Sequence, residues 1–130
     1  MRLGPWAVLA LAALAPAGLS EGGDKPQRTE LSLRAFPRAA LPPAEIRFVA
    51  AIEGDKGLAD YHCPEVEWDW DDGSRSVQQS DCAPDEPEST IERRFSSSHV
   101  YAAVGDYRVS ITLRRAKRSL ARATTSIMIR

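Results

Sequence analysis

The sequence predicts an all-β fold, a single antiparallel β-sandwich of about seven strands. An aromatic strand that contains Trp68 and Trp70 runs directly into Asp72-Gly73, and Asp-Gly is a strong signal for a tight turn between strands. A strand of strict alternation begins at Tyr107. After the N-terminal apolar stretch, no segment has the 3.6-residue period of an amphipathic helix.

The first 17 residues are predicted to be an export signal. A basic residue near the start is followed by an apolar stretch over residues 6–14 and by Ala-Pro-Ala at 15–17, which fits a small-x-small cleavage site. Cleavage after residue 20 is the alternative. The apolar stretch is shorter than the roughly 20 residues that a membrane-spanning helix needs. We therefore expect a mature chain without a transmembrane helix, secreted or periplasmic.

Residues 18–28 are polar and contain glycine and proline, so we expect a short flexible leader there. Residues 29–130 then form one domain.

The formal charge of the whole chain is −1, so no net field attracts nucleic acid or an anionic membrane. The charges are nevertheless polarised, because ten acidic residues lie within 60–88 and seven Lys or Arg residues, without an acid, lie within 107–130.

Two strands are predicted in the first part of the domain. Residues 31–35 alternate between apolar and polar, and Pro37 and Pro42-Pro43 then interrupt the pattern, which indicates an edge strand with a kink. Residues 46–52 alternate more clearly and end at Gly54-Asp55-Lys56-Gly57, which has the composition of a turn.

The middle of the chain contains the aromatic strand. Val66, Trp68 and Trp70 alternate with acidic residues, so the two indoles are expected to point inward. An acidic loop over residues 81–88 follows. Residues 90–95 are predicted to form a strand that needs a bulge or an edge position, because Arg93 is in phase with its apolar neighbours.

The last two strands are joined by a basic hairpin. Tyr107, Val109, Ile111 and Leu113 alternate with polar residues, and apolar or small residues alternate again over 123–129. Between these strands lie residues 114–118, four of which are Arg or Lys.

Cys63 and Cys82 are the two cysteines of the chain. In an exported protein an oxidising compartment favours pairing, so we predict one disulfide between them. A structural zinc site is the rival interpretation, but His62-Cys63 with a distant Cys82 lacks the usual ligand spacing.

Three motifs, in this order and spacing, resemble those of the polycystic kidney disease (PKD) domain family, an immunoglobulin-like β-sandwich common in exported bacterial proteins. Residues 68–73, Trp-Asp-Trp-Asp-Asp-Gly, are similar to the family's Trp-Asp-Phe-Gly-Asp-Gly, with Trp70 in place of Phe and Asp71 in place of Gly. A His-x-Tyr motif and a Gly-x-Tyr-x-Val motif follow, and the resemblance covers residues 29–130. The matching residues are Trp68, Asp69, Trp70, Asp72, Gly73, His99, Tyr101, Gly105, Tyr107 and Val109.

The resemblance implies structural roles for these residues. Trp68 would pack at the centre of the core, and Tyr107 would be a corner tyrosine whose hydroxyl bonds to nearby backbone. The Trp-Asp strand would pair antiparallel with the Gly-x-Tyr strand. Glu67 would then lie toward Arg114, and Asp69 toward Arg108.

Calcium is a weaker hypothesis for the acidic turn. Asp69, Asp71 and Asp72 could offer oxygen ligands, but their spacing departs from the calcium-loop pattern and lacks its terminal Glu. We predict no other metal and no cofactor.

Catalysis has little support, since neighbouring residues of the Ser96-Ser97-Ser98-His99 run would point to opposite faces of a strand. The basic hairpin could suggest nucleic acid, but export and a net negative charge argue against it.

We therefore expect an exported, non-enzymatic module for protein or carbohydrate interaction or for spacing at the cell envelope. A self-assembling envelope protein is the alternative. Tyr61 is the one aromatic of the sandwich without a core explanation, which favours a protein partner over a glycan.

Overall fold

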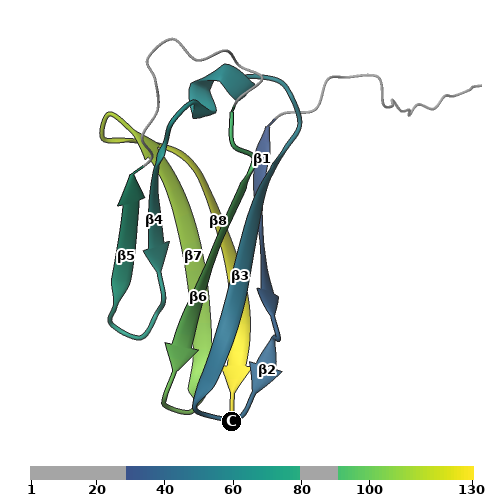
Figure 1. The fold of residues 1–130 in the computed structure, drawn as a ribbon, viewed down its shortest axis with the longest axis vertical. Coiled ribbons are helices and arrows are strands. Elements are labelled where there is room, and N and C mark those ends of the chain that lie inside the picture. Colours follow the sequence, from purple (N-terminus) through teal and green to yellow (C-terminus); the bar gives the residue numbers. More distant parts are fainter. Residues whose placement is uncertain (1–28, 80–90) are drawn as a thin grey trace, which may run out of the picture.

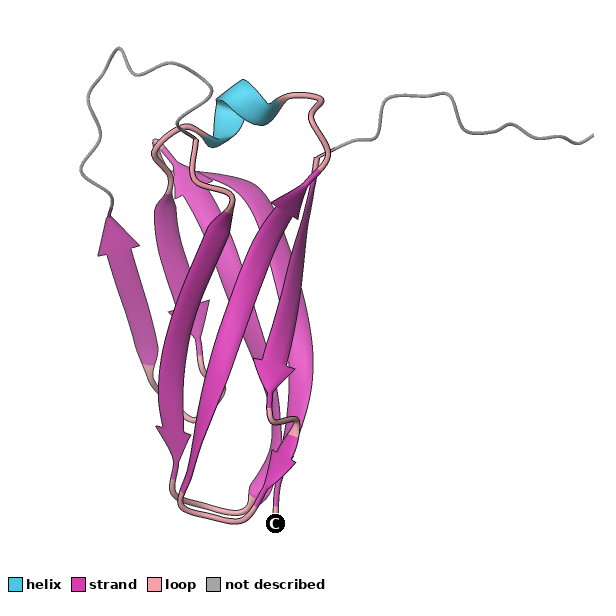
Figure 2. Cartoon of the chain, turned by 45° about the vertical axis from the view of Figure 1, so that its right-hand side comes forward, coloured by secondary structure: helices cyan, strands magenta, loops and turns pink. Residues whose placement is uncertain are grey.

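The computed structural model describes residues 29–79 and 91–130. The predicted signal, the leader, the acidic loop and Cys82 lie outside these residues. The described strands form two sheets that face each other, as Figures 1 and 2 show. The elements are β1 (Glu30–Phe36), β2 (Ala39–Ala40), β3 (Ala44–Glu53), the 3₁₀ helix η1 (Leu58–Tyr61), β4 (Glu65–Asp69), β5 (Arg75–Gln79), β6 (Arg94–Tyr101), β7 (Gly105–Arg115) and β8 (Arg118–Ile129).

The first sheet has the order β1-β3-β6, with antiparallel neighbours. Its central strand, β3, buries every second side chain, including Ile46, Phe48 and Ala50, and turns the residues between them outward. This is the alternation that the sequence predicts for residues 46–52. The edge position of β1 is confirmed as well.

The second sheet has the order β2-β8-β7-β4-β5. Its longest pairing is the β7–β8 hairpin, whose two turn residues, Ala116 and Lys117, have φ angles of 52° and 67°. Two successive residues with positive φ match a hairpin turn of type I′, whose twist suits the flanking strands. Between Pro37 and Pro42-Pro43 the chain crosses from the first sheet to the second, where the short β2 pairs parallel with the end of β8.

The core lies between the two sheets. Trp68, Trp70, Phe48 and Tyr101 are almost completely buried there, together with isoleucines and leucines from both layers. The two indoles stack at a centroid distance of 5.0 Å and an angle of 3°. The prediction that both tryptophans point inward is therefore confirmed.

Two parts of the strand prediction were wrong. We did not predict β5, whose sequence is Arg75-Ser76-Val77-Gln78-Gln79. It is an edge strand that pairs only with β4 and buries no apolar residue, so it shows no alternating apolar pattern. The strand predicted at residues 90–95 runs instead from Arg94 to Tyr101, at the edge of its sheet. Its inward side includes the polar Ser97 and His99, and the apolar Val100 faces outward, so the sequence shows no clear alternation of apolar and polar residues. No helix in the described part of the chain is long and apolar enough to cross a membrane.

Candidate functional site

The Trp-Asp motif forms a turn that joins β4 to β5. The Trp70 backbone N–H donates to the Ser74 carbonyl oxygen at 3.2 Å. Asp71 and Gly73 have φ angles of 64° and 92°, so both occupy the left-handed region. Glycine enters this region at little cost, and Asp tolerates it better than most residues. Asp71 can therefore stand where the resembling family has Gly.

The three aspartates of this turn accept hydrogen bonds from backbone groups of the domain. Asp69 Oδ1 accepts from the Asp71 N–H at 3.1 Å, and Asp71 Oδ2 accepts from the Arg108 N–H at 2.7 Å. Asp72 Oδ1 accepts from the Ser74 N–H at 3.0 Å. Each carboxylate is thus engaged in holding the turn or in joining it to β7.

His99 connects the turn to the first sheet. Its Nε2 lies 2.7 Å from Asp72 Oδ2, and its ring stacks on Trp70 at 4.6 Å and 1°. Burial alone would raise the pKa of Asp72, but the hydrogen bonds from Ser74 and His99 outweigh it and lower the pKa. The deprotonated carboxylate is therefore favoured in the folded state.

Ser74, His99 and Asp72 meet in space, yet their geometry differs from a catalytic triad. The Ser74 hydroxyl lies 3.5 Å from His99 Nε2, the same atom that contacts Asp72, and it also bonds to Asp72 Oδ1. A triad needs the acid on one ring nitrogen and the nucleophile on the other. In this arrangement the three side chains close the turn.

Replacement of Asp72 by Asn should lower the free energy of unfolding at neutral pH. Because the folded-state pKa lies below the ordinary value of 3.8, the stabilisation is present above that value and is lost as the pH falls through the folded-state pKa. The gap between wild type and Asp72→Asn in urea unfolding should therefore shrink below about pH 4. Asp106→Asn, at an exposed pair with Arg130, is the control and should change little. A gap that grew on acidification would contradict the assignment.

The two tyrosines of the later motifs bond to backbone carbonyls. The buried Tyr101 hydroxyl donates to the Trp70 carbonyl at 2.9 Å, across the two sheets. The Tyr107 hydroxyl donates to the Ala103 carbonyl at 2.7 Å, as a corner tyrosine does. Burial raises the pKa of Tyr101, and the carboxylates of Asp72 and Asp71 raise it further.

Trp68 occupies the centre of the core with no exposed surface. Its indole Nε1 has no hydrogen-bond partner among the residues that the structure describes, whereas Trp70 Nε1 donates to Ser76 Oγ at 2.9 Å. A buried indole N–H usually has a hydrogen-bond partner; among the described residues this is true of Trp70 but not of Trp68.

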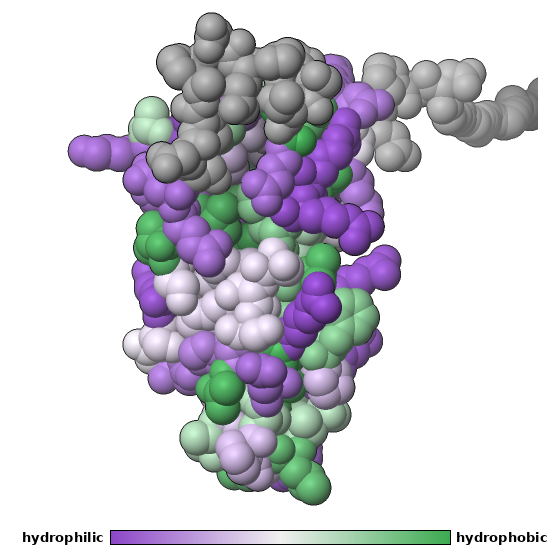
Figure 3. Space-filling view, viewed as in Figure 1, coloured by the Kyte–Doolittle hydropathy of each residue, from purple (hydrophilic) through white to green (hydrophobic). Residues whose placement is uncertain are grey.

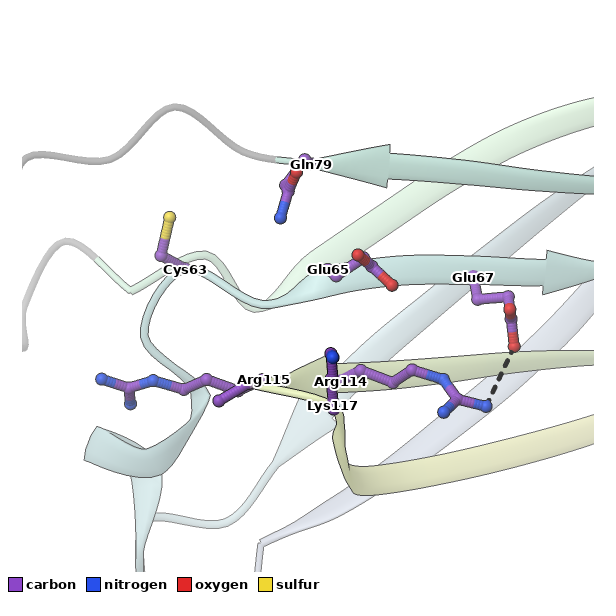
Figure 4. A pocket seen from close by; sticks show the side chains of 8 residues that line it. Cys63, Glu65, Glu67, Gln79, Arg114, Arg115 and Lys117 are labelled. Atoms are coloured by element: carbon purple, nitrogen blue, oxygen red, sulfur yellow. Dashed lines mark hydrogen bonds and ion pairs between the residues drawn. The ribbon is translucent and has the colours of Figure 1, made fainter.

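A groove of about 330 Å³ opens beside the β7–β8 hairpin (Figure 4). Glu67 and Arg114 form an ion pair at 3.3 Å on its wall, as predicted. The register places Glu65, not Glu67, directly opposite Arg114, so the ion pair is diagonal. The residues that line the groove are Cys63, Glu65, Glu67, Gln79, Arg114, Arg115, Ala116 and Lys117.

The predicted contact between Asp69 and Arg108 was wrong. Asp69 pairs instead with Arg75 of the neighbouring β5, at 3.5 Å, because Arg75 lies directly opposite it in the sheet. The strand that we did not predict supplies this partner. Arg108 contacts the turn through its backbone instead, because its N–H donates a hydrogen bond to the Asp71 carboxylate.

The structure brings no metal cluster together at these acids. Among the residues in 29–79 and 91–130, no group of three or more His, Cys, Asp or Glu side chains is placed to hold a metal ion. Calcium binding at Asp69, Asp71 and Asp72 stays a prediction, and so does the disulfide, because Cys82 lies outside the described residues.

The expectation about the exposed aromatic was wrong. Tyr61 is buried, with 8% of its surface exposed, and its hydroxyl lies 3.5 Å from the Leu120 carbonyl oxygen. Phe36 is exposed instead, by 52%. Strand parity could have identified it, because Phe36 follows the inward-facing Ala35 and must point outward.

Comparison with known proteins identifies the fold. No protein-family model matches this chain, and no curated protein matches it. Two solved structures are similar. The PKD domain of an M14-like peptidase from a Thermoplasmatales archaeon has a TM-score of 0.54 and 9% identity over 81% of this chain and 98% of that one. A CARDB domain from Pyrococcus furiosus, solved in complex with di-metal ions, has a TM-score of 0.53 and 11% identity over 90% and 100%. The chain is thus an immunoglobulin-like β-sandwich with the fold of a PKD domain.

Proposed function

We propose that this chain is an exported, non-catalytic interaction module of the cell envelope, which binds a protein or a carbohydrate or spaces other components. One observation carries the proposal. The polar groups that could be mistaken for a reactive site, above all Asp72 and His99, bond to one another and to the turn. Their chemistry therefore maintains the shape of the domain, and binding falls to the outer faces of the two sheets.

Two parallel assays of the exported protein test this function. The purified protein is applied to a glycan array, and the same protein, immobilised, is used to retain material from the envelope of its own cells. We expect saturable binding in one of the two, and N-terminal sequencing should show a start after residue 17 or 20. Binding in neither assay would contradict an interaction role. Substrate turnover that disappears in His99→Gln would contradict the non-catalytic role.

Self-assembly is the second candidate, and an apolar end of the molecule favours it. Leu41, Val104 and Met128 are exposed, and the first and last of these line a shallow hollow of about 290 Å³ beside β2 and the end of β8. Figure 3 shows apolar surface at this end. Exposed apolar patches commonly mark contact sites. Light scattering should reveal oligomers that Leu41→Ser together with Val104→Ser dissociates, whereas a monomer at all concentrations would exclude this candidate.

A further inference from the structure

The outer face of the three-stranded sheet carries a groove of about 440 Å³. It exists because strands β1 and β3 turn every second residue away from the core, and the outward residues at its centre, Val49 and Ala51, are small. The residues that line the groove are Ser32, Arg34, Phe36, Arg47, Val49, Ala51, Glu53 and Arg94. In Figure 3 this face shows polar side chains beside apolar surface over β1 and β3.

Three arginines, one from each strand, give the groove its positive charge. Arg34, Arg47 and Arg94 are exposed, and no ion pair joins any of them to a carboxylate within the described residues. Glu53 is the one acid among the lining residues. Some exposed arginines elsewhere in the domain do pair with an acid, as Arg93 does with Asp55 and Arg130 with Asp106. The groove therefore offers three guanidinium groups that the domain itself leaves available.

The register places these cations at three successive levels along the groove. Arg47 lies in β3, Arg34 lies opposite Val49, and Arg94 lies opposite Ala51. The three therefore lie level with the successive outward positions 47, 49 and 51 of β3, in steps of roughly 7 Å along its axis, and Arg34 and Arg94 lie on opposite sides of that strand. Such spacing suits a linear ligand with repeated negative groups better than a single compact anion.

Phe36 adds an apolar surface at one end of this row. It is 52% exposed and lies directly opposite Arg47. An exposed aromatic ring can pack against the carbon face of a sugar ring, while a guanidinium fork binds a carboxylate or sulfate through two parallel hydrogen bonds. An acidic sugar carries both features, a carbon face on its ring and a carboxylate or sulfate group, so it can make both contacts at once.

We propose that this face binds an acidic polysaccharide, a linear chain of sugar rings that carry carboxylate or sulfate groups. The proposal rests on the proposed function as an interaction module, and it names the ligand class and the surface. An acidic peptide fits less well, because extended peptides bind to sheets by pairing with an edge strand. At the centre of this face, the backbone groups of β3 already pair with β1 and β6, so side chains must provide the recognition.

Titration of the full exported chain with polygalacturonate tests the proposal. The test variant replaces Arg34, Arg47 and Arg94 together by Gln. A matched control, Arg115→Gln with Lys117→Gln and Arg118→Gln, removes the same charge from the β7–β8 hairpin, which belongs to the other sheet. We expect the test variant to weaken binding by roughly 10- to 100-fold and the control by less than about 3-fold. Phe36→Ser alone should weaken binding by roughly 5-fold.

Each outcome decides a separate part of the proposal. Equal losses in the two triple variants would mean unspecific charge attraction and would overturn the groove as the site. Tighter binding of poly-glutamate or of an oligonucleotide than of polygalacturonate would overturn the ligand class. If no acidic polymer binds while the glycan array or the envelope assay finds another partner, this inference fails and the proposed function stands. All substituted side chains are exposed, and melting curves will show that the variants fold.

Discussion

Trp68→Ala is expected to cost about 3 to 5 kcal/mol in the free energy of unfolding, the usual range for truncation of a buried large aromatic residue. Trp68 has no exposed surface, stacks on Trp70 and lies 6.3 Å from the ring of Phe48, between the two sheets. Small domains are stable by only about 5 to 15 kcal/mol. The variant should therefore be largely unfolded or melt far below wild type, as measured by circular dichroism.

Val77→Ala is a control for this result. Val77 lies on β5, next to the strand of Trp68, but it is 59% exposed. Its replacement should change the free energy of unfolding by no more than about 0.5 kcal/mol. A Trp68→Ala protein that kept the wild-type melting temperature and lost a ligand instead would show that the indole is part of a binding site.

Tyr101→Phe should lower the free energy of unfolding by about 1 to 3 kcal/mol, because it leaves a buried carbonyl without its partner. The Tyr101 hydroxyl donates to the Trp70 carbonyl at 2.9 Å, and both residues are almost fully buried. This hydrogen bond joins β6 in one sheet to the end of β4 in the other. Urea unfolding of the purified variant measures the loss.

Tyr107→Phe provides the matched comparison, since it removes a hydroxyl that also bonds to a backbone carbonyl. The Ala103 carbonyl that accepts this bond lies in an exposed loop, where water can replace the lost donor. We expect a smaller loss, about 0.5 to 1.5 kcal/mol. If Tyr107→Phe destabilised the domain more than Tyr101→Phe, burial could not be the source of the difference.

The strands with buried alternate residues could be predicted from the sequence. Ile46, Phe48 and Ala50 in β3 and Val109, Ile111 and Leu113 in β7 repeat with the period of two that a half-buried strand imposes. Edge strands escape this reasoning. β5 buries none of its side chains fully, so its existence depends on hydrogen bonds to β4, which leave no mark on the pattern of residue types.

The structural roles of the motif residues were predictable, whereas only some of their partners were. Strand alternation placed Trp68 and Trp70 on one face, and the family resemblance implied that Glu67 lies toward Arg114, with which it forms an ion pair. Neither could show that Asp69 pairs with Arg75, because that pair requires a strand that the pattern does not reveal.

The inward or outward direction of a side chain follows from strand parity, which is local and can be read along the chain. Which exposed side chains meet depends on the register between strands that are distant in sequence. Arg34, Arg47 and Arg94 come from three separate strands and share one groove only because β1, β3 and β6 pair in this register. Composition and periodicity thus establish the β-sandwich and its aromatic core. The basic groove arises from long-range pairing, because backbone hydrogen bonds between strands place these residues side by side.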